Sequence, residues 1–437
     1  MPRTRRDALR LLAGGAATSL RLASQPRRPN LVILYADDLG WGDVGFNGRK
    51  TWSTPNLDRM ASQGTRFSRW YTGMPLCAPS RACLLTGRYN IHNGVRTNGS
   101  DIPVSEVTIA EALKPHGYAT ALIGKWHRGR LPDGGFTHPL DQGFDQTYGF
   151  LDARHAWEHY PKYLFRGREQ VSASGYTADT FSDQGIEFIR RHRNQPFFLY
   201  LAYIEPHFLI EAPPEEVAKL QGRFPEKDSS SPVNATYAAM IHRLDAGIGR
   251  VLRTLEETGL AENTVVVFSS DNGGTFEVGN KGAAFYHDSN HPFRGQKRSL
   301  EEGGIRVPGI VWGPGRAPAG RTVEDPVHMM DVMPTFLAAA GLRPEPAWNL
   351  DGSNLLDVWQ GKAQVPERTL FWDWSTEGYQ MQAAMRGDMK LLQIGGNSFL
   401  YNVRQDPGER RTLQGEYPEL FKQLQAESKA WLATARQ

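Results

Sequence analysis

A cysteine at position 77 opens the segment Leu76 to Arg88, whose residue types and order suit a short helix that carries a reactive group. Pro79 suits the first helical turn, the run Ala82 to Leu85 favours continuation, and Gly87 can adopt the left-handed conformation that ends a helix. We therefore expect Cys77 at or just before the helix N-terminus, where free backbone N–H groups and the helix dipole favour negative charge. That position suits a thiolate or a bound oxyanion.

Cys77 also has more ordinary explanations. A disulfide with Cys83, the other cysteine of the chain, is disfavoured because six helical residues separate the Cα atoms by about 9 Å, beyond the limit of about 7 Å for a disulfide. Cys77 could instead be a buried thiol, or the nucleophile of a cysteine hydrolase with a histidine partner. Composition excludes neither of these two.

Polar pairs directly follow two strongly apolar segments, residues 30–36 and residues 264–270. Continuous apolar runs of this length suit strands that are buried on both faces of a parallel sheet. Because the ligand crevice of such sheets lies beyond the carboxyl ends of the strands, we expect the two pairs to converge there. A turn with one solvated carboxylate is the alternative at each place. The four residues are Asp37, Asp38, Asp271 and Asn272.

Three carboxylates and one amide oxygen form a hard donor set made only of oxygen. Neighbouring buried carboxylates are costly unless positive charge binds them. An all-oxygen set suits Ca²⁺ or Mg²⁺ far better than Zn²⁺. The spacing alone leaves open whether these residues form a metal site or coincide by chance.

The segment around Cys77 resembles the signature of the type I, formylglycine-dependent sulfatases of the alkaline phosphatase-like superfamily, in which Cys-x-Pro-Ser-Arg is followed by Leu-Thr-Gly-Arg. The resemblance implies that a maturation enzyme oxidises this cysteine to Cα-formylglycine (3-oxoalanine). It also implies a bound divalent ion, usually calcium and alternatively magnesium. The matching residues are Cys77, Pro79, Arg81, Thr86, Gly87 and Arg88, and the implied metal ligands are Asp37, Asp38, Asp271, Asn272 and the modified Cys77.

Three further segments match the same family in the same order along the chain. Taken alone, each could be a surface loop with a solvated cation or a strand end with a structural histidine. The segments are Gly124-Lys125-Trp126-His127-Arg128-Gly129, which departs from the family only at Arg128; Pro206-His207; and Arg294 to Lys297 with Glu301 to Pro308. The resemblance implies catalytic roles for Cys77, Arg81, Lys125, His127, His207 and Lys297.

The resemblance further implies how these residues would divide the chemistry. The hydrate of oxidised Cys77 would attack sulfur while the metal and Asp271 help to deprotonate it. His207, together with Lys297, would protonate the leaving oxygen. His127 would then take a proton from the second hydroxyl of the sulfated hydrate and so expel sulfate. The sulfate itself would be held by Arg81, Lys125, His207 and Lys297.

The implied substrate is a sulfate monoester, on a sulfated carbohydrate or on an aryl alcohol. The same site could serve phosphonate monoesters or phosphodiesters, because it recognises a tetrahedral oxyanion more than its central atom. A binding protein whose Cys77 stays unmodified is the non-enzymatic alternative. Aromatic side chains for the alcohol subsite are expected in the loop Phe276 to His291 and in the segment Asp141 to Tyr163, which contains Tyr148, Trp157, His159 and Tyr160.

The pattern of the whole chain predicts an α/β fold. Residues 25–345 are expected to form a catalytic domain with a large, mostly parallel sheet flanked by helices. Residues 346–437 are expected to form a smaller C-terminal α+β subdomain with a short antiparallel sheet and a terminal helix. The expected helices include Val107 to His116, Asn234 to Glu257 and Glu419 to Ala435, and the expected strands include Tyr118 to Ile123, Phe197 to Ile204, Thr369 to Trp374, Gln382 to Arg386 and Lys390 to Ile394.

Residues 1–24 resemble an export signal of the twin-arginine type, with Arg5 and Arg6 ahead of the short apolar run Leu11 to Leu20. A disordered basic tail is the alternative. The full chain has 50 basic and 47 acidic side chains, and the leader holds five Arg and one Asp, so the remainder has 45 against 46. We therefore expect an exported, periplasmic or extracellular protein that neither binds nucleic acid nor inserts stably into a membrane.

Overall fold

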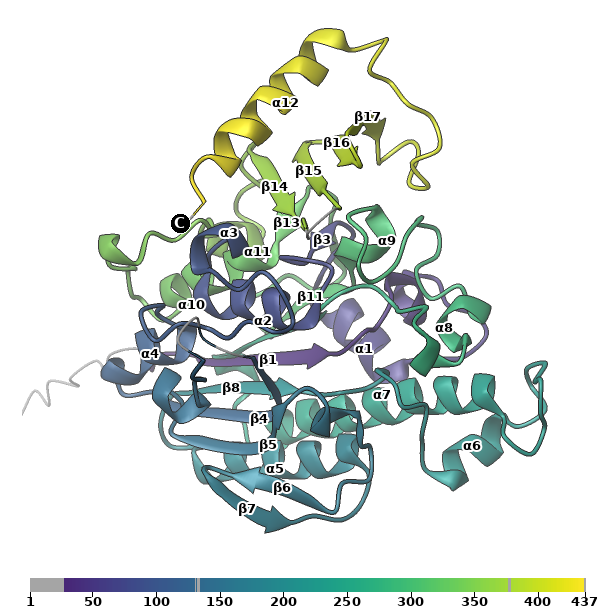
Figure 1. Cartoon of the computed structure of the whole chain (residues 1–437). Coiled ribbons are helices and arrows are strands. Elements are labelled where there is room, and N and C mark those ends of the chain that lie inside the picture. The colour runs from purple at the N-terminus through teal and green to yellow at the C-terminus, as the bar shows by residue number, and fades with distance from the viewer. Residues whose placement is uncertain (1–26, 130, 132–133, 376–378, 436–437) are drawn as a thin grey trace, which may run out of the picture.

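The computed structural model describes residues 27–129, 131, 134–375 and 379–435, and the predicted leader lies outside them. The described part has the predicted α/β architecture, with one large sheet between two layers of helices and a small sheet at the C-terminal end (Figure 1). No helix in these residues is long and apolar enough to cross a membrane.

The large sheet has ten strands in the order β12-β2-β11-β9-β1-β8-β4-β5-β6-β7. The central strands β9, β1, β8, β4 and β5 run parallel, and β11, β6 and β7 pair antiparallel. Every residue of β1, β8 and β9 is buried, as their continuous apolar sequences require. The strands are β1 Asn30–Ala36, β2 Thr65–Phe67, β4 Ala119–Arg128, β5 Gln146–Asp152, β6 Tyr163–Arg166, β7 Glu169–Ser172, β8 Phe197–Ala202, β9 Thr264–Ser270, β11 Gly309–Trp312 and β12 Arg321–Val323.

Helices cover both faces of this sheet and bury two separate apolar clusters against it. One face packs against α1 Pro55–Gln63, α5 Thr177–Arg191 and α7 Val233–Glu257. The other packs against α2 Cys77–Thr86, α4 Ile109–Leu113 and α10 Val332–Ala339. The shorter helices are α3 Asn90–Asn93, α6 Pro214–Leu220, α8 Ala283–Tyr286, α9 Glu302–Ile305 and α11 Leu356–Trp359.

Two predicted elements near the site differ from the structure. The helix expected over 107–116 is the short α4 followed by a 3₁₀ turn at Lys114–His116, because Pro115 has no N–H to continue the α-helical ladder. The strand expected to end at Ile123 continues to Arg128, because β5 pairs beside it as far as Asp152. Lys125 and His127 therefore lie on a strand instead of in a loop.

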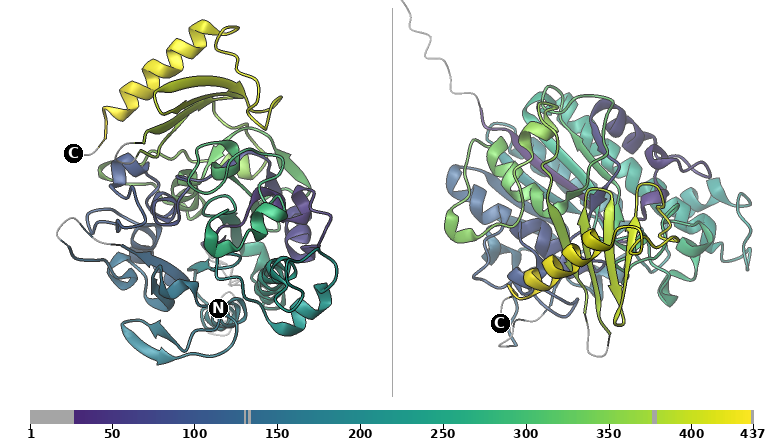
Figure 2. Two further views of the ribbon diagram at one scale, coloured as in Figure 1. Left: turned by 45° about the vertical axis from the view of Figure 1, so that its right-hand side comes forward. Right: turned by 90° about the horizontal axis from the view of Figure 1, so that it is seen from above.

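A four-stranded antiparallel sheet packs between the main body and the terminal helix α12 Pro418–Leu432 (Figure 2). Its first three strands match the prediction, whereas the fourth, β17, was not predicted. Gly387, which has φ +55°, lies in the hairpin turn between β15 and β16. The strands are β14 Thr369–Asp373, β15 Met381–Arg386, β16 Met389–Ile394 and β17 Asn397–Asn402, and a third small sheet contains β3 Trp70–Tyr71, β10 Arg306–Val307 and β13 Val327–His328.

A buried cluster of charges joins this small sheet to the main body. Lys390 of β16 lies 2.9 Å from a carboxylate oxygen of Glu302 at the start of α9 and 3.0 Å from one of Glu409. All three side chains are fully buried. Since unpaired charges are costly in such surroundings, this cluster fixes the start of α9 against the C-terminal sheet.

Candidate active site

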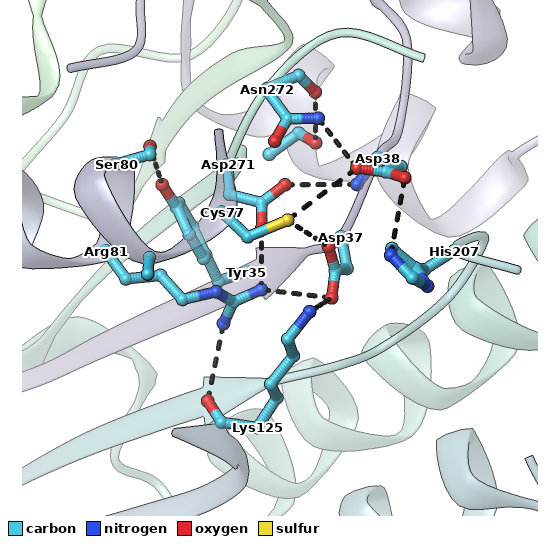
Figure 3. A network of polar contacts seen from close by, with 12 residues as sticks. Tyr35, Asp37, Asp38, Cys77, Ser80, Arg81, Lys125, His207, Asp271 and Asn272 are labelled. Carbon is cyan, nitrogen blue, oxygen red and sulfur yellow. Dashed lines mark hydrogen bonds and ion pairs between the residues drawn. The ribbon is translucent and has the colours of Figure 1, made fainter. Parts of the chain in front are cut away.

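The register of the central strands brings the predicted acidic residues together. Ala36 pairs with Ser270, so that Asp37 and Asp271, which follow them, lie at the same edge of the sheet. β8 pairs with β1 on the other side and leads into the segment that carries His207. The parallel order of these strands thus gathers residues from distant parts of the sequence (Figure 3).

Cys77 is the first residue of α2 and its thiol points into this acidic group. Its Sγ lies 3.4 Å from a carboxylate oxygen of Asp37 and 4.0 Å from one of Asp38. Burial, with the nearby carboxylates of Asp271 and Asp37, raises the pKa of the thiol well above its ordinary value. The unmodified side chain is therefore a protonated thiol, which argues against the thiolate nucleophile of a cysteine hydrolase. Both Cys77 and Cys83 are free, as the helical spacing predicted.

Three cationic side chains lie among the carboxylates. The Lys125 ammonium is 2.5 Å from Asp37, and the Lys297 ammonium is 2.9 Å from Asp38. The Arg81 guanidinium contacts Asp271 at 2.8 Å and Asp37 at 3.4 Å. All three cations are almost wholly buried.

The position of Lys125 in the site depends on Gly124, the residue before it on β4. Gly124 has φ +110°, and a Cβ there would lie 1.9 Å from the carbonyl oxygen of Ala202 on β8. Only glycine permits this close approach of β4 and β8.

His127, two residues further along β4, is buried with both ring nitrogens unpartnered among the described residues. Burial, with the positive charges of Lys125 and Arg81, lowers the pKa of His127 well below its ordinary value. Its imidazole is therefore neutral and able to accept a proton.

His207 lies across the site from Cys77, with Nε2 at 3.7 Å from a carboxylate oxygen of Asp38. Its Nδ1 is 2.6 Å from the carbonyl oxygen of Phe208, which can only accept, so Nδ1 carries a proton. The nitrogen that faces the site is therefore the one that exchanges its proton. Burial, opposed by Asp37, lowers the pKa of His207 well below its ordinary value.

Sequence reasoning did not predict the residues that support His207 and Lys297, and it assigned His159 to the alcohol subsite instead. His159 is fully buried and its Nε2 lies 3.0 Å from the carbonyl oxygen of His207, while its Nδ1 lies 3.6 Å from Glu205. Glu277 lies 3.5 Å from the Lys297 ammonium. No local motif marks His159 or Glu277, because only the tertiary fold brings each beside its partner.

The predicted aromatic residues divide into two groups. Tyr148 is buried under the guanidinium of Arg166, and His159 is fully buried, so neither lines a substrate pocket as the sequence suggested. Trp157 and Tyr160 remain partly exposed, at 37% and 43%.

The donor set fits the hard divalent cation expected from the sequence. Ligand atoms of Asp37, Asp38, Cys77 and His207 all lie within 4.8 Å of one another. Asp271 accepts a hydrogen bond from the backbone N–H of Asp38 at 3.0 Å and so adjoins the same group. Apart from His207 and the unmodified thiol, these donors are oxygens, as calcium or magnesium prefers.

Asn272 supplies a further indication. Its amide nitrogen donates to Asp38 at 2.7 Å, while its buried oxygen has no partner among the residues that the structure describes. A buried oxygen without a partner is costly, and a cation would satisfy it once the amide turns.

The balance of charged side chains in the site also favours a bound divalent cation. Three carboxylates face three cations, which leaves no surplus positive charge for an anionic substrate. Burial and the neighbouring Asp37 raise the pKa of Asp271 to about 7, in spite of Arg81. A bound divalent cation would keep this carboxylate ionised and give the site the net positive charge that an oxyanion needs.

Comparison with known proteins agrees with this site. The sequence profile described as sulfatase matches residues 29–342. The chain is 33% identical over 400 residues to N-acetylgalactosamine-6-sulfatase of Canis lupus familiaris, covering 83% of this chain and 72% of the relative. It is 30% identical to steryl-sulfatase of Mus musculus, covering 95% and 84% of the two chains.

A solved structure is similar along nearly the whole chain. The crystal structure of Ps i-CgsB in complex with k-i-k-neocarrahexaose superposes with a TM-score of 0.85 at 31% identity, and 94% of each chain is covered. With the profile match and the relatives above, this shows that the chain belongs to the sulfatase family, the sulfuric ester hydrolases of alkaline phosphatase-like fold.

Proposed function

We propose that this sulfatase hydrolyses a sulfate monoester of a carbohydrate, using a formylglycine made from Cys77 and a divalent cation. The observation that carries the proposal is the placement of Cys77 at the start of α2, among three carboxylates and three buried cations. The names of the relatives, a sulfatase of N-acetylgalactosamine and a protein bound to a neocarrahexaose, support a sugar as the alcohol.

The two groups that the sulfatase chemistry needs would be held by residues described above. Oxidised Cys77 would supply the nucleophilic oxygen, and the cation would supply positive charge beside it. The cation would be held by Asp37, Asp38, Asp271, Asn272 and the modified Cys77. Side chains of the protein would bind the sulfate, protonate the leaving oxygen and remove the proton that completes turnover.

Arg81, Lys125 and Lys297 would bind the sulfate oxygens. Charge-assisted hydrogen bonds from buried cations are strong, and they gain most where negative charge grows in the transition state. Burial lowers the pKa of Lys297, but the surrounding negative groups, Asp38 foremost among them, together raise it well above its ordinary value, so this ammonium is fully protonated. An electrostatic clamp of this kind needs no movement of protons.

His207 would protonate the leaving oxygen. Its Nδ1–H donates to Phe208, so Nε2 is the nitrogen that faces the substrate. Because burial lowers its pKa, His207 takes up the proton that it donates when an anion enters the site. A sugar alkoxide is a poor leaving group and depends on this proton.

His127 would act as the base that completes turnover. It is neutral, buried and unpartnered in the described part of the chain, so its proton-accepting nitrogen is available. Its function would be to remove a proton from the sulfated hydrate of oxidised Cys77 and so expel sulfate.

The proposal is tested by turnover and by mass. Protein made together with a maturation enzyme should hydrolyse at least one member of a panel that contains 4-nitrophenyl sulfate and sulfated sugars. The peptide that contains Cys77 should show the mass change for replacing CH₂SH by CHO. Cys77→Ala should abolish both signals. A faster turnover of phenyl phosphonate monoesters or of phosphodiesters than of every sulfate would favour the alternative class, and no turnover at all would favour a binding protein.

Export is proposed as well, on the basis of the leader. A fusion of residues 1–30 to a reporter that survives transport only when folded should reach the periplasm, and changing Arg5→Lys with Arg6→Lys should block it. Normal export of the double variant would exclude a twin-arginine signal.

A further inference from the structure

An open groove of about 1130 Å³ lies beside the catalytic centre. One wall is the segment after the 3₁₀ turn His155–Trp157, and the other is the segment that runs from Leu209 into α6, which packs beside α7. We call this the side groove, and the residues used below are Glu158, Tyr160, Lys162, Leu209 and Glu211.

The side groove is connected to the catalytic histidine through both of its walls. Leu209 follows His207 by two residues, so their Cα atoms are at most about 7 Å apart. On the opposite wall, His159 contacts the carbonyl oxygen of His207 at 3.0 Å and is flanked by Glu158 and Tyr160. The backbone N–H of Leu209 also donates to the carbonyl oxygen of Trp157 at 3.4 Å. The side groove therefore begins beside the segment that carries His207.

The groove offers flat apolar surface at its mouth. Tyr160 is 43% exposed and Leu209 is 41% exposed, although both side chains are large. The Tyr160 ring is held by the buried ring of Tyr176, whose centroid is 5.3 Å away. A fixed aromatic face suits the apolar face of a sugar ring.

The polar side chains of the groove are free to bind a ligand. Within the described residues, no hydrogen bond or ion pair engages the side chains of Glu158, Lys162 or Glu211. Carboxylates only accept hydrogen bonds, which suits sugar hydroxyls as donors. Two carboxylates against one ammonium disfavour a sulfate group in this place. The groove therefore suits a neutral sugar better than a charged one.

We propose that the side groove binds an unsulfated sugar residue that adjoins the sulfated residue of a glycan substrate. This inference rests on the proposed sulfatase function and adds a second binding site to it. The catalytic centre would hold the sulfate ester, and the side groove would hold the next, neutral ring of the chain. The enzyme would therefore prefer an oligosaccharide to the sulfated monosaccharide.

The test compares matched substrates on the full, matured enzyme. Each sulfated monosaccharide of a panel that includes N-acetylgalactosamine 6-sulfate is paired with a trisaccharide in which two neutral sugars extend it, and 4-nitrophenyl sulfate reports the catalytic centre alone. For the wild type we expect kcat/KM on the hydrolysed trisaccharide to exceed that on its monosaccharide by about tenfold, the scale of one aromatic contact. Tyr160→Ala should remove this preference and leave 4-nitrophenyl sulfate hydrolysis within about twofold.

Two further variants separate a neutral from a charged occupant. Glu211→Gln keeps the shape of the groove and should reduce the trisaccharide preference, whereas Lys162→Gln should leave it nearly unchanged. A large loss in Lys162→Gln together with a gain in Glu211→Gln would show an anionic occupant and overturn the proposal. Tyr417→Ala, which removes a tyrosine of similar exposure (49%) just before α12, is the control and should change nothing.

The same turnover measurements distinguish a failure of the subsite proposal from a failure of the proposed function. Hydrolysis of 4-nitrophenyl sulfate with equal rates on monosaccharide and trisaccharide would overturn the subsite alone. Hydrolysis of 4-nitrophenyl sulfate with no sugar sulfate hydrolysed would overturn the subsite and the carbohydrate part of the proposed function, and would leave the sulfatase chemistry standing. No turnover of any sulfate by the wild type would overturn the proposed function and the subsite with it.

Discussion

Replacement of His207 should slow the hydrolysis of sugar sulfates far more than that of 4-nitrophenyl sulfate. The hydrogen bond from Nδ1 to Phe208 fixes the ring so that Nε2 faces the substrate, and the ring is only 3% exposed. A positioned general acid contributes about a hundredfold to ten-thousandfold, and a sugar alkoxide needs all of it. Nitrophenolate leaves without protonation, so His207→Ala should cost that substrate about tenfold or less.

The assay is steady-state kinetics of the matured variant on both substrates. His207→Gln is the companion variant, because it keeps a polar side chain of similar reach and removes only the titrating ring. His116→Ala, a change at an exposed histidine of the 3₁₀ turn after α4, is the control and should leave both activities intact. Calcium content of each variant should be measured, since His207 lies close to Asp38. Equal losses on both substrates with full metal content would refute the role as an acid and make His207 a binding residue.

The remaining predictions concern the metal, the acid, its support and the C-terminal sheet. Asp271→Ala should lower the calcium content measured by elemental analysis, and an undiminished content would remove this residue from the ligand set. The ratio of sugar sulfate to nitrophenyl sulfate turnover should keep rising as the pH falls below the ordinary histidine pKa of about 6.5, because burial depresses the pKa of His207 and leaves it short of protons even there; a flat ratio would contradict this. His159→Phe should lower kcat on sugar sulfates with little change in KM, and His159→Gln should restore part of it, since Gln can again donate to the backbone carbonyl; no rescue would indicate a purely structural role. Lys390→Met strands two buried glutamates and should lower the free energy of unfolding in urea by about 3–5 kcal/mol, whereas the exposed Lys429→Met should not; a similar midpoint for both would show that the buried cluster contributes little.

Much of the site could be predicted because sequence pattern and sheet geometry agree. The apolar runs of β1 and β9 are unmistakable as buried strands, and parallel strands place Asp37 and Asp271 at one edge. The helical signals around Cys77 were equally local: the helix begins at Cys77 and Gly87 ends it in the left-handed conformation. The strand and helix assignments of these residues depend on local sequence alone.

Other features depend on tertiary contacts that no local pattern reveals. β17 begins with polar residues, and its pairing with β16 is made by the second hairpin at Gly395 and Gly396. Tyr148 and His159 are residue types that often line sugar-binding surfaces, yet tertiary packing buries both of them. The boundaries of the predicted domains remain predictions, because the C-terminal sheet shares its apolar core with the main body.

The burial of α2 implies that the proposed oxidation of Cys77 has to take place before the chain folds. Every residue of this helix is buried, and Cys77 is only 1% exposed. An enzyme that modifies Cys77 could not reach it in the folded chain, so the proposed oxidation would compete with folding from the moment of synthesis. A molecule that folds first would stay inactive for its lifetime, however stable it is. The active fraction of a preparation would then report the ratio of two rates, and slower folding would raise the specific activity without any change in the active site.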